Sequence, residues 1–158
     1  MKVLDFLARL CALAAGVLLT AITLMTCVSV AGRNTTGWTI VGDFELTASA
    51  AGAAIALFLP LTQLRRDNIV VDFFTAGASA RTIGAMDRFG ALLLAGVMAL
   101  MAWRSVLGGL SAWSTQAGSM MLGFPEWIVY CCIVPPLVLT AVIALWQTAA
   151  GFGAGERT

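Results

Sequence analysis

The residues of this chain that could do chemistry gather in one polar segment, residues 32–46, between two long apolar stretches. Arg33 in this segment can pair with Glu45, or with an acid on a partner, because a guanidinium forks readily onto a carboxylate. Asp43 can instead cap the helix that follows, and Glu45 complements the dipole of that helix in its first turn. Two carboxylates spaced i, i+2 point in different directions on a helix, so a catalytic pair is not expected.

Other catalytic and metal-binding arrangements are also missing from the sequence. The chain has no histidine, which is the commonest general base and metal ligand. Its four cysteines lie in apolar stretches without a C-x-x-C spacing, and no phosphate-binding loop or nucleophile elbow occurs. The net charge of +1, without a basic stripe, argues against nucleic acid as a partner. We therefore predict no catalytic residue, no metal and no cofactor.

The composition indicates what kind of element must position the polar segment. Of the 158 residues, 60% are apolar and 11% are charged, whereas a soluble domain has about 25% charged residues. Four apolar stretches are long enough to cross the bilayer as helices. We predict an all-α integral membrane protein, with a single membrane domain over residues 1–158 and spans at about 10–31, 44–64, 88–110 and 126–148. Because charges are nearly absent from these spans, the sequence favours a partner or scaffold over a catalyst.

Two features of the spans bear on their contacts. In the second span, Ala48, Gly52 and Ala56 repeat at a four-residue spacing that lets helix backbones approach closely, either within this chain or against another protein. In the third span, Arg104 lies roughly 22 Å along the helix from Phe89. We expect Arg104 to reach the outer interface by extending its side chain toward water.

The basic residues predict the orientation. If the N-terminus is cytoplasmic, then the outside carries Arg33 and Arg104, and the inside carries Lys2, Arg9, Arg65, Arg66, Arg81, Arg88 and Arg157. Cytoplasmic loops are enriched in Lys and Arg, so both termini are expected in the cytoplasm.

The segment between the second and third spans has helical periodicity of its own. Asn68, Asp72, Thr75 and Ser79 fall at i, i+4, i+7 and i+11 and form a polar stripe. This pattern predicts a short amphipathic helix over residues 68–80 that lies flat in the cytoplasmic interface, and an extended linker is the alternative. Basic residues at either end, Arg65, Arg66 and Arg81, are then candidate contacts for anionic lipid headgroups, together with Asp72.

Several motifs, in order, resemble the small permease subunit (DctQ-like) of tripartite ATP-independent periplasmic (TRAP) transporters. The resemblance covers about residues 5–147 and rests on Gly32-Arg33, Gly37-Trp38, Gly42-Asp43-Phe44-Glu45-Leu46, Leu64-Arg65-Arg66-Asp67-Asn68-Ile69-Val70-Val71-Asp72, Ala102-Trp103-Arg104 and Ser119-Met120-Met121-Leu122-Gly123-Phe124-Pro125-Glu126-Trp127.

This resemblance implies a role in the bacterial inner membrane. In such transporters a large permease, driven by a sodium gradient, moves an organic acid by an elevator motion after a periplasmic binding protein delivers it. The small subunit braces the static scaffold of the large one and is not expected to bind sodium or substrate. By this analogy Arg33, Asp43, Glu45 and Arg104 are candidate subunit-interface residues on the outer side, and the flat helix around Asp72 anchors the brace in the inner leaflet.

Three other functions compete with this interpretation. An autonomous four-span channel or small transporter would need polar groups along a pore, yet the spans offer mainly Ser, Thr and a few Gln, which more often bond between helices. An accessory subunit of another membrane complex fits the same composition. A membrane enzyme of lipid or quinone chemistry would use the loop acids, but the chain has no nucleophile–base pair.

Overall fold

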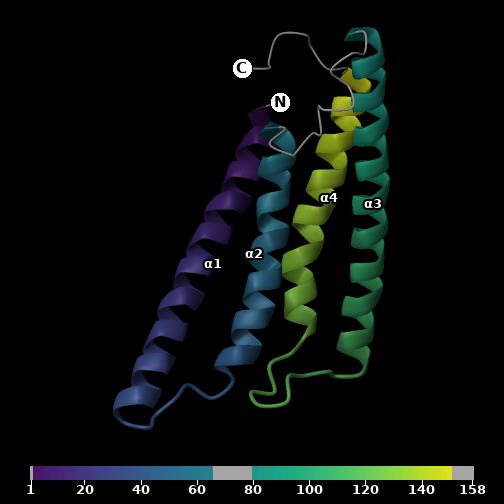
Figure 1. Cartoon of the computed structure of the whole chain (residues 1–158). Helices are drawn as coiled ribbons and strands as arrows, with labels where there is room; N and C mark the ends of the chain where they lie inside the picture. Colours follow the sequence, from purple (N-terminus) through teal and green to yellow (C-terminus); the bar gives the residue numbers. More distant parts are fainter. Residues whose placement is uncertain (1, 66–79, 151–158) are drawn as a thin grey trace.

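Four long helices make up the regular structure of the described residues. The computed structural model of this chain describes residues 2–65 and 80–150, and its helices are α1 (Lys2–Thr35), α2 (Asp43–Arg65), α3 (Ala80–Ser114) and α4 (Trp127–Ala150) (Figure 1). Each helix is long and apolar enough to cross a membrane. The predicted all-α fold is therefore confirmed over the described residues, with four helices long and apolar enough to span a membrane. The predicted interfacial helix over 68–80 lies outside the described residues, apart from residue 80, where α3 begins.

The helices are arranged in an open row in the order α1–α2–α4–α3. Helix α2 packs on α1 and on α4, and α3 packs on α4, with little contact between α1 and α4 (Figure 1). Helix α3 therefore forms one edge of the row and α1 forms the other. Chain neighbours α2 and α3 are separated in space by α4, so the order in the row differs from the order in the sequence.

The row is held together by small side chains. Nearly all of the buried apolar residues are alanines, and most of the large apolar side chains face outward. Small residues let helix backbones approach closely in lipid, where no hydrophobic effect drives one helix onto another. The larger side chains that are fully buried lie mainly on α4 and the second half of α2. They include Pro60, Pro136, Thr140 and Ile143. The outward apolar surface must be covered by lipid or by another protein.

The small-residue repeat of α2 is divided between two faces. Ala56 is buried within the chain, together with Ala53 and Ala54. Ala48 and Gly52 are exposed, and no atom lies within 4 Å of the position that a Cβ of Gly52 would occupy. The first half of the repeat therefore does not pack within the described part of this chain.

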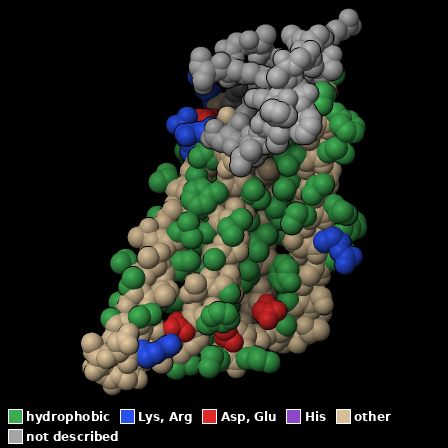
Figure 2. Space-filling view, in the orientation of Figure 1, with side chains coloured by type: hydrophobic (Ala, Val, Ile, Leu, Met, Phe, Trp, Pro, Cys, Tyr) green, Lys and Arg blue, Asp and Glu red, His purple; other side chains and the backbone are tan. Residues whose placement is uncertain are grey.

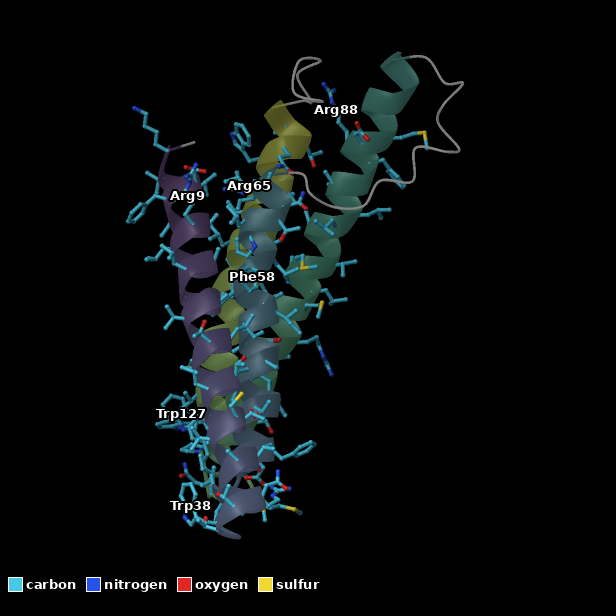
Figure 3. All side chains as sticks on the ribbon, turned by 60° about the vertical axis from the view of Figure 1, so that its left-hand side comes forward. Arg9, Trp38, Phe58, Arg65, Arg88 and Trp127 are labelled. Atoms are coloured by element: carbon cyan, nitrogen blue, oxygen red, sulfur yellow. The ribbon has the colours of Figure 1, made fainter. Side chains whose placement is uncertain are left out.

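The two ends of the row have different chemistry. The start of α1 and the end of α4 lie at one end, called the terminal end here, and the connections 36–42 and 115–126 lie at the opposite end, called the loop end (Figure 1). Figure 3 shows Arg9, Arg65 and Arg88 toward the terminal end and Trp38 and Trp127 toward the loop end.

A buried amide pair links α2 to α4 near the terminal end. The Nε2 of Gln63 donates to Oε1 of Gln147 at 2.7 Å, and the Nε2 of Gln147 donates to the backbone carbonyl of Gln63 at 2.9 Å. Both side chains are buried. Buried polar groups are costly unless they are hydrogen-bonded, so this pair fixes how far α2 is shifted along α4.

Candidate functional site

The predicted site residues of the loop end form a hydrogen-bond chain between α1 and α2. Nη2 of Arg33 donates to Oγ1 of Thr39 at 3.2 Å, and Oγ of Ser29 donates to Oδ2 of Asp43 at 2.5 Å. Because the single hydroxyl proton of Ser29 is used on Asp43, the 2.9 Å bond between Ser29 and Thr39 must be donated by Thr39. Donation therefore runs in one direction, from Arg33 through Thr39 and Ser29 to the Asp43 carboxylate.

Of the two partners considered for Arg33, the one within the chain, Glu45, is wrong. Nη2 of Arg33 lies 3.6 Å from Oδ2 of Asp43, and not beside Glu45. The reason is local: Asp43 opens α2 directly after the turn at Gly42, where φ is +76°. Its Oδ1 also accepts from the backbone N–H of Phe44 at 2.7 Å. The guanidinium of Arg33 remains 62% exposed, so it keeps donors that can reach a partner.

Glu45 joins α2 to the other connection of the loop end. Its two carboxylate oxygens accept from the backbone N–H of Met121 at 3.1 and 3.3 Å. These residues are 76 positions apart in the chain. Glu45 therefore positions the α3–α4 connection, and it has a different partner from Asp43. The two carboxylates therefore have separate hydrogen-bond partners.

A second contact between the two connections lies at Gly42. A Cβ at this position would come within 2.5 Å of Cγ and Cδ1 of Leu122. Gly42 is also one of the positive-φ glycines, a conformation that L side chains rarely adopt. Gly42 therefore lets the α1–α2 connection turn sharply and lets Leu122 lie directly against it.

The α3–α4 connection is a compact hairpin-like loop. Ser119 N–H donates to the Phe124 carbonyl at 3.0 Å, and Gly123 N–H donates to the Ser119 carbonyl at 3.0 Å. At the base of the loop, the rings of Trp113 and Trp127 meet edge to face with centroids 4.9 Å apart. An aromatic pair in this geometry stabilises the junction of α3 and α4 beyond its buried area.

Large apolar side chains are exposed around these polar contacts. Met120 is fully exposed, and the other exposed apolar residues of the loop end are Trp38, Val41, Phe44, Met121 and Leu122. Figure 2 shows acidic side chains near the loop end and a mainly apolar surface between the two ends. Exposed apolar residues beside charges are typical of a contact surface, here for a protein or for the membrane interface.

Arg104 lies apart from this cluster. Positions for a Cβ on Gly108 and Gly109 fall 2.9 and 3.0 Å from Tyr130, which is three residues after the start of α4. Because α3 and α4 are antiparallel, Arg104 is level with a point roughly 11 Å along α4 from Trp127. Arg104 is exposed, and within the described ranges no carboxylate lies within 4 Å of it. The structure therefore does not bring Arg104 together with Arg33, Asp43 and Glu45.

The predicted lipid-contact residues are only partly described. Arg65 is exposed in the last turn of α2 at the terminal end (Figure 3). Arg81 lies in the first turn of α3, and its side chain is not among those described. Arg66 and Asp72 lie outside the described residues.

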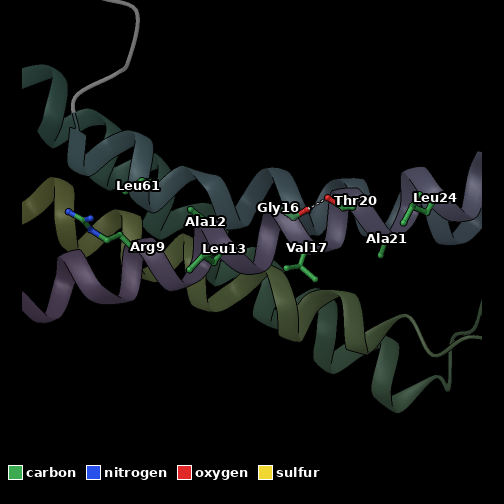
Figure 4. A pocket seen from close by; sticks show the side chains of 9 residues that line it. All are labelled: Arg9, Ala12, Leu13, Gly16, Val17, Thr20, Ala21, Leu24 and Leu61. Carbon is green, nitrogen blue, oxygen red and sulfur yellow. Dashed lines mark hydrogen bonds between the residues drawn. The ribbon is translucent and has the colours of Figure 1, made fainter.

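An open apolar groove of about 840 Å³ runs along α1. Its walls are mainly α1 side chains with one residue from α2, and they are Arg9, Ala12, Leu13, Gly16, Val17, Thr20, Ala21, Leu24 and Leu61 (Figure 4). The Thr20 hydroxyl donates to the carbonyl of Gly16 at 2.8 Å, and Arg9 donates to Asp5 at 2.9 Å. Few polar groups converge on this groove, so it lacks the features of a small-molecule binding site.

Sequence reasoning missed Ser29 and its link to Thr39. Ser29 is completely buried although it lies near the end of a helix whose other faces are mostly exposed. A usable signal was present, because Ser29 stands four residues before Arg33 and therefore on the same face of α1. The contacts of Met121 and Leu122 had no comparable signal, since their partners, Glu45 and Gly42, are about 80 residues away in the chain.

One comparison with known proteins identifies a family. The family model described as "Tripartite ATP-independent periplasmic transporters, DctQ component" matches residues 22–152, which include three of the four helices in full and part of α1. No curated protein and no solved structure gives a significant match.

Proposed function

Because the chain belongs to the DctQ component family of tripartite ATP-independent periplasmic transporters, we propose that it braces the scaffold of a large sodium-coupled permease. Membership makes it a small multi-pass membrane subunit of a transporter. In the proposed system the large permease works as an elevator, and a periplasmic binding protein delivers an organic acid to it. This chain binds neither sodium nor substrate, and it holds the static part of the permease in place.

The open row of helices supports the proposed bracing role. A substrate path within this chain would require helices that close around it, whereas α1 and α3 form free edges here and many large apolar side chains are exposed. The polar groups that lie inside the row bond to each other or to the backbone, as the Gln63–Gln147 pair does. A single layer of helices with an apolar exterior is suited to lie against a larger membrane protein.

The distribution of charge supports a membrane orientation. Arg9, Arg65 and Arg88 lie toward the terminal end (Figure 3), and basic residues are enriched on the cytoplasmic side. The proposed orientation places both termini in the cytoplasm of a bacterial cell and the loop end in the periplasm. Headgroup contacts by Arg65, Arg66, Asp72 and Arg81 are part of the same proposal.

The loop end is the proposed contact with the periplasmic side of the transporter. Its exposed guanidinium, Arg33, stands beside exposed apolar residues such as Phe44 and Met120. Asp43 shapes this surface by accepting from Ser29 on α1, and Glu45 does so by accepting from Met121 in the α3–α4 connection. The partner at this end is the permease scaffold or the docked binding protein.

Reconstitution tests the function. Liposomes that contain the large permease are supplied with binding protein, labelled organic acid and an inward sodium gradient, with and without this chain. We expect sodium-dependent uptake in the presence of the chain and little uptake in its absence. Liposomes that contain this chain alone serve as the control. Ion or substrate flux from the chain alone would instead support an autonomous channel or transporter.

A further inference from the structure

Helix α3 has small side chains on one face and large side chains on the opposite face. The side chains buried against α4 are the alanines Ala91, Ala95, Ala102 and Ala112. At about 100° per residue, Ala95 and Ala102 point roughly 160–180° away from Arg104 around the helix. Arg104 is therefore directed away from the rest of the described chain.

Toward the middle of α3, the residues that share a face with Arg104 are large and apolar. Positions three, four, seven and eleven residues away lie on one side of a helix. These residues, Leu93, Val97, Leu100, Met101 and Leu107, are all exposed, and with Arg104 they are called the α3 outer face.

The position of Arg104 along this face makes its charge costly in lipid. It is level with a point roughly 11 Å along α4 from Trp127, and tryptophans are enriched where the membrane meets water. A cation at such a depth on a lipid-facing helix is disfavoured unless it is paired or its side chain extends to the interface. The described residues provide no carboxylate for it.

Two other exposed arginines, Arg9 and Arg33, differ from Arg104 because each has a carboxylate partner. Arg33 lies beside Asp43, and Arg9 is bonded to Asp5, each close to an end of α1. Arg104 combines an unpaired guanidinium, an apolar setting and a position within the length of a helix. A carboxylate fits the planar fork of a guanidinium, and lipid phosphates are concentrated at the membrane surface.

We propose that the α3 outer face packs against a transmembrane helix of the large permease, and that this helix presents a carboxylate to Arg104. The inference rests on the proposed function, because it takes the permease as the partner. It adds that the α3 edge of the row makes the contact and that a carboxylate of the permease binds Arg104.

Photo-cross-linking in the intact transporter tests the face. A photoreactive amino acid replaces Leu100 on the α3 outer face or, as the matched control, Leu13 in the α1 groove, and both positions are exposed apolar residues. We expect Leu100 to cross-link to the permease. Cross-linking at Leu13 and not at Leu100 would place the interface on α1 and overturn the proposal.

Substitution of Arg104 tests the charge. Loss of one partner of a desolvated charge pair leaves the other charge uncompensated, so Arg104→Leu should lower co-purification of the permease at least about tenfold. Arg104→Lys keeps the positive charge but lacks the planar fork of the guanidinium, so it should lower co-purification of the permease less than Arg104→Leu does. Undiminished co-purification of Arg104→Leu would overturn the carboxylate contact, with lipid phosphate as the remaining partner.

The proposed function and the proposed contact of the α3 outer face are contradicted by different results. If the wild-type chain does not co-purify with the permease, then the proposed function fails. If the wild type does co-purify and the α3 outer face does not cross-link to the permease, then only this inference fails. The Leu100 experiment keeps Arg104 intact, so it does not depend on how well the Arg104 variants insert into the membrane.

Discussion

The contact between Gly42 and Leu122 gives a quantitative test of the loop end. In Gly42→Ala, the new Cβ would lie 2.5 Å from Cγ and Cδ1 of Leu122, at a backbone φ of +76°. An L residue in the left-handed region costs roughly 1–2 kcal/mol, and overpacking costs about 1–3 kcal/mol. Leu122 is 43% exposed and can move partly aside. We therefore expect a total loss of about 2–4 kcal/mol of unfolding free energy.

Gly37→Ala is the matched control for this substitution. Gly37 has a φ of +73°, but no atom lies within 4 Å of its Cβ position. This variant should show the backbone cost alone, roughly 1–2 kcal/mol. Thermal unfolding in mild detergent, followed by tryptophan fluorescence, measures both, since Trp38 and Trp127 lie toward the same end (Figure 3).

A third variant separates the two contributions to the Gly42→Ala effect. Adding Leu122→Ala should recover the part of the loss that comes from overlap, and the interaction is obtained from the double-mutant cycle. Equal unfolding midpoints for Gly42→Ala and Gly37→Ala would refute the reasoning, because the Leu122 contact would then contribute nothing.

Three further substitutions probe other contacts of the row. Ser29→Ala removes the donor to Asp43 and should cost about 1–3 kcal/mol of unfolding free energy, measured by the same assay; an unchanged midpoint would argue against the hydrogen-bond chain. Gln147→Leu should cost about 1–3 kcal/mol because it removes the amide bonds to Gln63, and a gain in stability would contradict a role in fixing α2 on α4. Arg33→Glu should leave the unfolding midpoint of the chain nearly unchanged, since an exposed ion pair contributes little. The same substitution should lower uptake by the reconstituted transporter. Full uptake would remove Arg33 from the interface.

The helices were predictable because charge is expensive in lipid. Interruptions by Arg, Asp and Glu separate the apolar stretches, so the number and approximate extent of the helices follow from composition and spacing. Glu45 was also placed correctly in the first turn of α2, and Asp43, which was expected to cap this helix, is its first residue. These inferences depend on neighbours in the chain, and local patterns carry that information.

The contacts between distant segments were not predictable in the same way. The expected Arg33–Glu45 pair ignored the turn at Gly42, which brings Asp43 to Ser29 and Arg33 instead. Glu45 is occupied by the backbone of Met121, and a backbone donor leaves no mark in the sequence. The order α1–α2–α4–α3 rests on contacts between small residues, which look alike on every helix.

The depth of Arg104 needed the structure for the same reason. Counting from Phe89 along the sequence predicts a position close to the outer interface. The contact of Gly108 and Gly109 with Tyr130 sets the register of α3 against α4 and places Arg104 level with a point roughly 11 Å along α4 from Trp127.

The composition of the purified assembly tests the central claim most directly. The chain is extracted in mild detergent from a membrane that also contains the large permease, and native mass spectrometry gives the mass of the complex. We expect a complex in which this chain is bound to a much larger multi-span protein. We expect no transport activity from the chain alone. A stable homo-oligomer of this chain that transports by itself would contradict it.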